Sequence, residues 1–195
     1  MEKFIKPRLL TPSGQSHKKF WQAAGLCALT AAIFFLPFYL LDGGFFHYAG
    51  DFNSQQISFY RYMNGFVKGA GYPDSAFAGA PRNTFSWATD LGSGVMNAYS
   101  FYLYGSPFFW LSVLLPQSWL PYMMVPLLVL KFGVAGGGAY LYLRRYVKNA
   151  NYAVLGACLY ALSGFAVYNV FFNHFVDVVA LFPYLLWALD EAIYE

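Results

Sequence analysis

The stretch 21-WQAAGLCALTAAIFFLPFYLL-41 contains no charged residue. A helix needs ~20 residues to cross the ~30 Å hydrocarbon core of a bilayer, and this stretch is that long. It exceeds the roughly 7–15 apolar residues of a signal-peptide core, and no small-x-small cleavage site follows before Asp42. We therefore expect an uncleaved membrane-spanning helix.

Three further apolar runs follow, over 120–143, 152–172 and 176–189, and the first contains Lys131 as its only charge. The whole chain is 58% hydrophobic and 11% charged, against about 25% charged residues in soluble domains. These runs predict an all-α polytopic membrane protein with about four transmembrane helices.

Lysine and arginine predict the orientation. Basic residues gather before the first helix and between the second and third: Lys3, Lys6, Arg8, Lys18, Lys19, Arg144, Arg145 and Lys148. Such residues favour the cytoplasmic side, so we expect a cytoplasmic N-terminus. The net charge of +3 then reflects topology, and we expect no nucleic acid as a partner.

The expected organisation is a tail followed by a single membrane domain over 20–195. In order, we expect a cytoplasmic tail over 1–19, helix one over 20–41, an outer loop over 42–118, helix two over 119–143, a cytoplasmic loop over 144–151, helix three over 152–172 and helix four over 176–192.

The large outer loop is rich in polar and aromatic residues. Phe52, Phe59, Met63 and Phe66 recur at helical spacing after Asp51, which predicts an amphipathic helix on the outer membrane surface. A second interfacial segment is expected over 101–116. A simple membrane anchor has no use for such a loop, so polar chemistry at the membrane surface is indicated.

Several short motifs resemble the bacterial YfhO-like membrane protein family over about residues 20–195. They are Gly50-Asp51-x-x-x-Gln55, Phe85-Ser86-Trp87, Leu91-Gly92-x-Gly94, Tyr104-x-Ser106-Pro107-Phe108, Leu130-Lys131, Tyr140-Leu141-x-Leu143-Arg144-Arg145, His174-Phe175-x-Asp177 and Leu181-Phe182-Pro183. Their order and spacing carry the resemblance.

The resemblance implies a membrane glycosyltransferase of the GT-C type in the bacterial cytoplasmic membrane. Such enzymes transfer a sugar from a polyprenyl-phosphate donor to an extracytoplasmic acceptor, here a cell-wall polymer such as a teichoic acid, or a glycolipid. Membrane lipid is the surrounding partner. Because the family is much longer, with a dozen or so helices, we expect this chain to be the N-terminal part of a longer protein.

The resemblance also places an essential acid soon after helix one, and Asp51 matches that position. Sugar transfer needs a base for the acceptor hydroxyl, or a ligand for a divalent cation such as Mg²⁺ or Mn²⁺ held against the donor phosphate. The alternative is a helix N-cap. Both can hold, since a helix start favours an anion.

His174 and Asp177 are a second pair of candidates. They are three residues apart, so they share a face of a helix. At the outer end of helix four they would complete a catalytic site with Asp51, and Asp51 with Asp177 would hold the metal ion. The alternative is that Asp177 caps the helix and His174 lies at the interface.

Two residues are candidates for the donor phosphate. Asp90 precedes the Gly92-Ser93-Gly94 turn, whose backbone N–H groups can cradle phosphate, although a tight loop explains the same residues. Lys131 is a charge within a span, which marks a functional-site hypothesis. It can pair with the lipid phosphate, with a buried acid, or with a helix outside this chain.

Two other classes stay open, a lipid or polymer transporter and a non-catalytic membrane assembly subunit. In a transporter, Lys131 and the acids would line a pathway. An assembly subunit would tolerate alanine at Asp51, whereas a glycosyltransferase would not.

Overall fold

The computed structural model describes residues 16–48, 50–68, 85–86 and 91–194. The sequence predicts one membrane domain, but the chain divides into two compact units. Unit 1 comprises Met1–Phe35, Leu128–Val170 and Phe175–Glu195, and unit 2 comprises Leu36–Leu127 and Phe171–His174.

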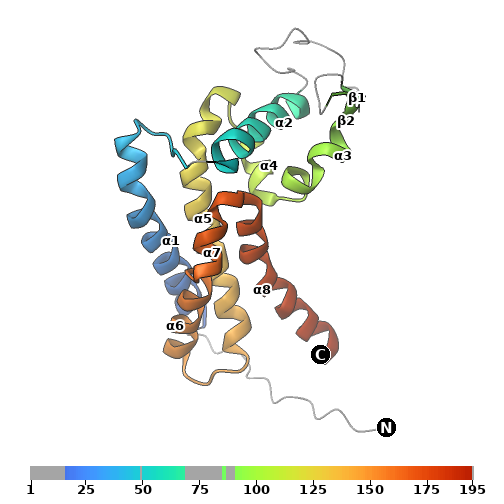
Figure 1. Ribbon diagram of the computed structural model, residues 1–195. Helices are drawn as coiled ribbons and strands as arrows, with labels where there is room; N and C mark the ends of the chain where they lie inside the picture. Colours follow the sequence, from blue (N-terminus) through green and yellow to red (C-terminus); the bar gives the residue numbers. More distant parts are fainter. Residues whose placement is uncertain (1–15, 49, 69–84, 87–90, 195) are drawn as a thin grey trace. The chain divides into compact units, whose positions relative to one another are not determined.

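Helices make up almost all of the described secondary structure (Figure 1). In chain order the elements are α1 (Ser16–Leu41), η1 (Phe52–Ile57), α2 (Ser58–Lys68), β1 (Phe85–Ser86), β2 (Ser93–Gly94), α3 (Val95–Tyr99), η2 (Ser100–Tyr104), α4 (Pro107–Val113), η3 (Gln117–Trp119), α5 (Leu120–Arg144), α6 (Ala150–Ala161), α7 (Gly164–Tyr168), η4 (Asn169–Phe172) and α8 (Asn173–Tyr194). Both η1 and η2 are π-helical, whereas η3 and η4 are 3₁₀-helical.

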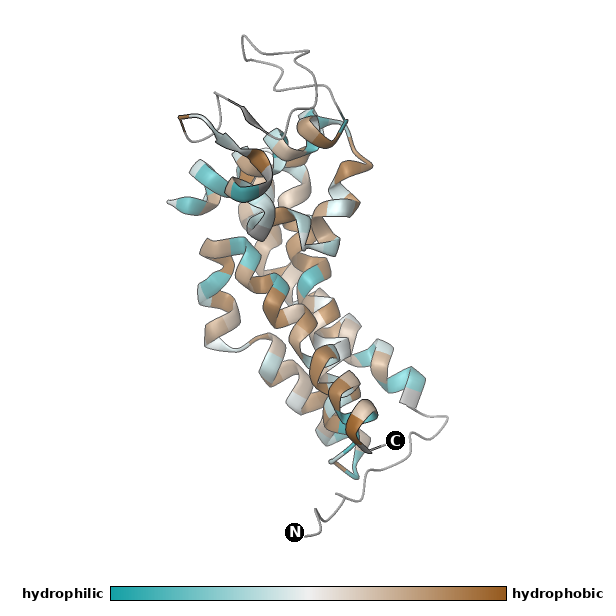
Figure 2. Cartoon of the chain, turned by 90° about the vertical axis from the view of Figure 1, so that its right-hand side faces the viewer, coloured by the Kyte–Doolittle hydropathy of each residue, from teal (hydrophilic) through white to brown (hydrophobic). Residues whose placement is uncertain are grey.

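Among the residues that the structure describes, three helical stretches are long and apolar enough to cross a membrane: His17–Leu41, Gln117–Arg144 and Ala150–Ile193. In Figure 2, most of each long helix is brown, the colour of hydrophobic residues. The prediction of an all-α membrane protein is therefore confirmed.

The expected helices three and four both fall within the third stretch, which is 44 residues long. Helix three is not continuous over 152–172 as predicted: α6 ends at Ala161, and Ser163 adopts an extended conformation and caps α7 through the N–H of Ala166. Within unit 1, α6 and α7 run in one direction and α8 returns (Figure 1). The Tyr160 hydroxyl donates to the Val179 carbonyl at 3.0 Å across this reversal.

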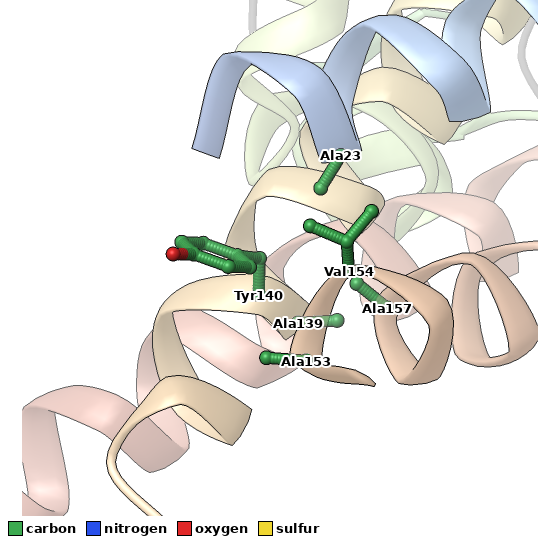
Figure 3. Close-up of a cluster of buried hydrophobic side chains, with 6 residues drawn as sticks. All are labelled: Ala23, Ala139, Tyr140, Ala153, Val154 and Ala157. Atoms are coloured by element: carbon green, nitrogen blue, oxygen red, sulfur yellow. The ribbon is translucent and has the colours of Figure 1, made fainter. Parts of the chain in front are cut away.

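The core of unit 1 joins α1, α5 and α6 (Figure 3). Its buried members are mostly alanines around one large ring: Ala23, Ala139, Tyr140, Ala153, Val154 and Ala157. Small side chains let membrane helices approach closely.

Glycines of α5 allow the closest of these approaches. A Cβ at Gly136 would lie 2.5 Å from Cys27 Sγ and 3.1 Å from the Ala23 carbonyl oxygen of α1, and one at Gly133 would lie 3.2 Å from the Ala28 Cβ. The Gly133-x-x-x-Gly137 motif thus lies at a helix–helix contact. Cys27 is fully buried there, with its Sγ 3.8 Å from the Sγ of Cys158.

Polar contacts join the loop after α5 to the end of α8. Arg145 pairs with Glu191 and lies 3.9 Å from Asp190, and the Tyr146 hydroxyl donates to Asp190. Arg145 is only 5% exposed. One of the arginines that predicts topology therefore also fastens the packed helices of unit 1.

In unit 2, α2 packs on α4 and η3. The rings of Tyr60 and Phe109 meet edge to face at 5.7 Å. Asn64 is buried and donates to the carbonyl of Ser112 at 2.9 Å, and Gln117 donates to the carbonyl of Arg61 at 2.9 Å. The amphipathic helix forms, but its buried side includes polar residues and faces protein.

Candidate functional site

Asp51 precedes η1 in unit 2 and is half-buried. Its backbone is already helical, at φ −63° and ψ −25°, and its side chain makes no capping hydrogen bond. Instead, Asp51 Oδ1 accepts from Gln55 Nε2 at 3.2 Å. The helix-cap alternative therefore does not describe this carboxylate, because a side chain and not the backbone N–H groups holds it.

The turn before Asp51 depends on Gly50. Its φ of +87° is a left-handed conformation that side chains disfavour. A Cβ at Gly50 would also overlap the ring of Phe171 in the same unit. This glycine therefore determines how the chain enters η1, and so where the Asp51 side chain starts.

His174 belongs to the same unit as Asp51. Its Nδ1 lies 3.3 Å from Gln56 Nε2, and its ring meets that of Tyr102 edge to face at 4.6 Å. The consecutive glutamines Gln55 and Gln56 thus contact Asp51 and His174 respectively. These two sets of contacts, joined through the consecutive glutamines, comprise Asp51, Gln55, Gln56, Tyr102 and His174. We call them the outer cluster, after the outer loop and outer turn predicted from the sequence.

Sequence reasoning missed Gln56 and Tyr102, both of which contact His174. Gln56 follows Phe52 by four residues and precedes Tyr60 by four, so it occupies the apolar side of the helical pattern. It is 1% exposed. The signal was a polar residue on the apolar face of a helix. Such a residue becomes buried and must find a hydrogen-bond partner inside the protein.

Lys131 and Asp177 form an ion pair inside unit 1. Lys131 Nζ lies 2.6 Å from Asp177 Oδ1, with the lysine side chain fully buried and the aspartate side chain 10% exposed. Both residues lie within candidate membrane spans. Of the partners considered for Lys131, the structure thus provides a buried acid from this same chain.

Asp177 and His174 both lie near the start of α8, as expected from their spacing, but they contact different residues. His174 contacts Gln56 and Tyr102 in unit 2, and Asp177 pairs with Lys131 in unit 1. The joint metal site of Asp51 and Asp177 links residues of different units and stays a prediction.

The described residues bring few metal-ligating side chains together. No group of three or more His, Cys, Asp and Glu side chains that could hold a metal occurs within the described part of the chain. Mg²⁺ needs no such group when one or two carboxylates and the substrate phosphates hold it together with water. Asp51 fits that simpler arrangement as a single carboxylate ligand.

Asp90 lies outside the described residues, so its role at the donor phosphate stays a prediction. Next to it, β1 and β2 pair antiparallel, Phe85 with Gly94 and Ser86 with Ser93. Leu91 and Gly92 have φ values of 64° and 105°. Both the phosphate role and the tight-loop alternative for this segment therefore stay predictions.

Comparison with known proteins gives one family. The model of the family described as bacterial membrane protein YfhO matches residues 26–195. No curated protein and no solved structure matches the chain. The matched range includes every element from the middle of α1 to the end of α8, and with it the outer cluster and the ion pair.

Proposed function

The chain belongs to the YfhO family of bacterial membrane proteins, and on that premise we propose that it acts in sugar transfer. The donor is a polyprenyl-phosphate-linked sugar, and the acceptor is a hydroxyl of a cell-wall polymer, such as a teichoic acid, or of a glycolipid. The reaction takes place at the outer face of the bacterial cytoplasmic membrane, with the N-terminus in the cytoplasm.

One observation carries the proposal. Asp51 follows the first membrane span closely, yet its carboxylate makes no backbone cap and is held by the side chain of Gln55. A carboxylate fixed by one amide keeps lone pairs for a proton or a cation. This is the arrangement that a general base or a metal ligand requires.

In the proposed step, the acceptor hydroxyl oxygen attacks the anomeric carbon of the donor sugar. A new carbon–oxygen bond forms, and the bond from that carbon to the phosphate oxygen breaks. The electron pair leaves with polyprenyl phosphate, while the hydroxyl proton passes to Asp51. A divalent cation bound beside Asp51 would supply charge stabilisation for the leaving phosphate.

The other candidate residues have subsidiary places in the proposal. His174 contacts Gln56, the residue after the Asp51 partner Gln55, and we assign it a supporting role through hydrogen bonding. Asp90 remains a predicted contributor at the donor phosphate, whereas the roles predicted from the sequence for Lys131 at the donor phosphate and for Asp177 in catalysis are replaced in this proposal by a structural one. Because Lys131 and Asp177 neutralise each other, a structural role is the simpler account of that pair.

A second candidate function is transport of a lipid or polymer. The observation in its favour is the ion pair Lys131–Asp177, since buried charges within spans often line a pathway. Replacing both residues together separates the two functions. A transporter would lose activity, whereas a transferase that uses Asp51 would keep it.

The test compares Asp51→Asn with a matched control, Asp42→Asn, in the full-length protein. Asp42 is another acid of unit 2; hydrogen bonds from the side chain and backbone of His47 lower its pKa. Each variant is expressed in a strain that lacks the protein, and the sugar content of its cell-wall polymers is measured. Asp51→Asn should abolish the sugar at equal protein level, and Asp42→Asn should restore it.

If Asp51→Asn restores the sugar as well as the parent protein does, the assignment of Asp51 is wrong. If the parent protein restores no sugar to polymer or glycolipid, the transferase proposal itself fails. Protein levels in the membrane fraction keep a folding defect from being read as lost chemistry.

A further inference from the structure

The buried side-chain amide of Gln56 in unit 2 has a partner for its nitrogen, whereas its oxygen has none within the described residues. Gln56 is 1% exposed, and its Nε2 lies 3.3 Å from His174 Nδ1. Within the described ranges, Gln56 Oε1 is buried and has no hydrogen-bond partner. Buried polar atoms in this condition are rare in native proteins and costly. The oxygen therefore has an unused capacity to accept a hydrogen bond.

The orientation of this amide follows from its contacts. As the amide is placed, its NH₂ group faces His174 Nδ1, and this nitrogen accepts from it in the tautomer that carries its proton on Nε2. Turning the amide over would give the oxygen a donor but would leave both NH₂ protons without the imidazole. The contact with His174 therefore directs Oε1 away from the imidazole, as an acceptor.

The surroundings indicate the chemistry of the missing donor. Gln56 comes from the π-helical η1 and Tyr102 from the π-helical η2, and both meet His174. Such π-helical segments are frequent at functional sites. His174 and Tyr102 are half-buried, so they connect the buried amide to the surface of unit 2. Amides, a carboxylate and aromatic rings together suit a ligand with several hydroxyl groups and apolar C–H faces.

Asn64 provides the contrast within the same unit. It too is fully buried with an unpaired side-chain oxygen, within the described part of the chain. Its NH₂ group, however, donates to the backbone carbonyls of Ser112 at 2.9 Å and Leu115 at 3.3 Å. Asn64 thus ties α2 to the end of α4, whereas among the described residues the side chain of Gln56 is held by His174 alone.

We propose that Gln56 is a sugar-recognition residue, whose Oε1 accepts a hydrogen bond from a ring hydroxyl of the sugar while His174 holds its NH₂ group. The inference rests on the proposed function for the identity of the ligand, a hexose carried on a prenyl phosphate. Gln56 then selects the sugar, and Asp51, five residues earlier, serves the reacting hydroxyl.

The test measures binding and needs no turnover. The full-length protein is purified in a detergent without a sugar headgroup. Its thermal unfolding midpoint is measured with farnesyl phosphate and with farnesyl phosphate carrying glucose, galactose or N-acetylglucosamine. The difference between the sugar-bearing and the sugar-free probe is the sugar increment. Gln56→Met, which keeps the length of the side chain without its oxygen, is compared with the parent protein.

In the parent protein we expect a positive increment for at least one sugar. Gln56→Met should remove that increment and leave the response to farnesyl phosphate alone unchanged. Without ligand, it should unfold no earlier than the parent, because the lost contact with His174 is offset by removing an unpaired buried oxygen. Gln56→Glu, which keeps an acceptor oxygen, should retain the increment.

Three results would overturn the inference: an equal increment in Gln56→Met, no increment with any of the sugars in the parent protein, or a Gln56→Met protein that fails to fold. Asn64→Leu is the matched control and should lower the midpoint while keeping the sugar increment. The readout also separates the two proposals. Sugar binding that depends on Gln56 without any transfer would sustain the inference and defeat the proposed function.

Discussion

The ion pair of unit 1 and the outer cluster of unit 2 use polar residues in opposite ways. Lys131 and Asp177 are buried against each other at 2.6 Å, with opposite charges that cancel. In the outer cluster, Asp51 is held by a neutral amide, and Gln56 keeps a buried oxygen unpaired within the described residues. The first arrangement is closed, and the second has unused capacity for a ligand.

This difference separates stability from function. A charge buried beside its partner costs much to break and offers little to a substrate. A carboxylate held by one neutral partner loses little of its capacity to bind a proton or a cation. We therefore expect changes in unit 1 to act on folding and changes in the outer cluster to act on activity.

The largest effect on folding should come from breaking the ion pair on one side. Lys131→Met leaves Asp177 as an uncompensated buried charge, which costs about 3–5 kcal/mol of unfolding free energy. The double variant Lys131→Met/Asp177→Leu should recover most of that loss. Unfolding by denaturant in detergent measures both. If the double variant is less stable than the single one, the two residues do not act as a pair.

The second largest loss of stability should come from filling the glycine contact between α1 and α5. Gly136→Val places atoms where Cys27 and the Ala23 carbonyl lie, and overpacking of this kind costs about 1–3 kcal/mol. Gly25→Ala on α1 is the control, since a Cβ there meets nothing within 4 Å. The unfolding midpoints of the two variants are compared. Equal midpoints would show that the helices do not pack as closely as described.

Within unit 2, Gly50→Ala should destabilise the turn that carries Asp51. Strain at a positive φ costs about 1–3 kcal/mol, and overlap with Phe171 adds to it. Gly105→Ala, with open space at its Cβ and a φ of −77°, is the control. Proteolysis of the outer loop measures the effect. A Gly50→Ala protein as resistant as the control would contradict the described turn.

The smallest effect should be a pH dependence at the end of α8. Burial and the hydrogen bond with Asp190 raise the pKa of Tyr146 above its ordinary value of 10.0. The folded chain therefore holds the phenol proton more tightly than the unfolded chain does. This contribution is complete below about pH 10 and is lost as the pH rises through the folded pKa.

Tyr146→Phe isolates that contribution. The stability difference between the parent protein and Tyr146→Phe should be constant at neutral pH and should shrink above pH 10. Unfolding midpoints across that range measure it. A difference that grows with pH would mean that the phenolate is the favoured form in the folded chain.

Composition and hydropathy were sufficient to predict the membrane-spanning class, because length and absence of charge decide which helices can cross a bilayer. They did not reveal the interruption of helix three, since the cap at Ser163 involves two small residues within an otherwise apolar run. Hydropathy reports burial in lipid, whereas a cap is a local hydrogen-bonding event.

The candidate site was predictable only in part. Asp51 follows from the resemblance and from its place after helix one. The contact between Gln56 and His174 joins residues 118 positions apart, and spacing along one helix cannot show such a pairing. The partner of Lys131 was open for the same reason, because Asp177 lies on a different helix of unit 1.

The most direct measurement is the rate of sugar transfer, per folded protein, for two variants of the full-length protein side by side. For Asp51→Asn we predict a loss of about 10²–10⁴-fold, the usual contribution of a general base. For Lys131→Met/Asp177→Leu we predict a rate close to that of the parent. A transfer rate that survives in Asp51→Asn and disappears in the double variant would contradict the account and assign the chemistry to the ion pair.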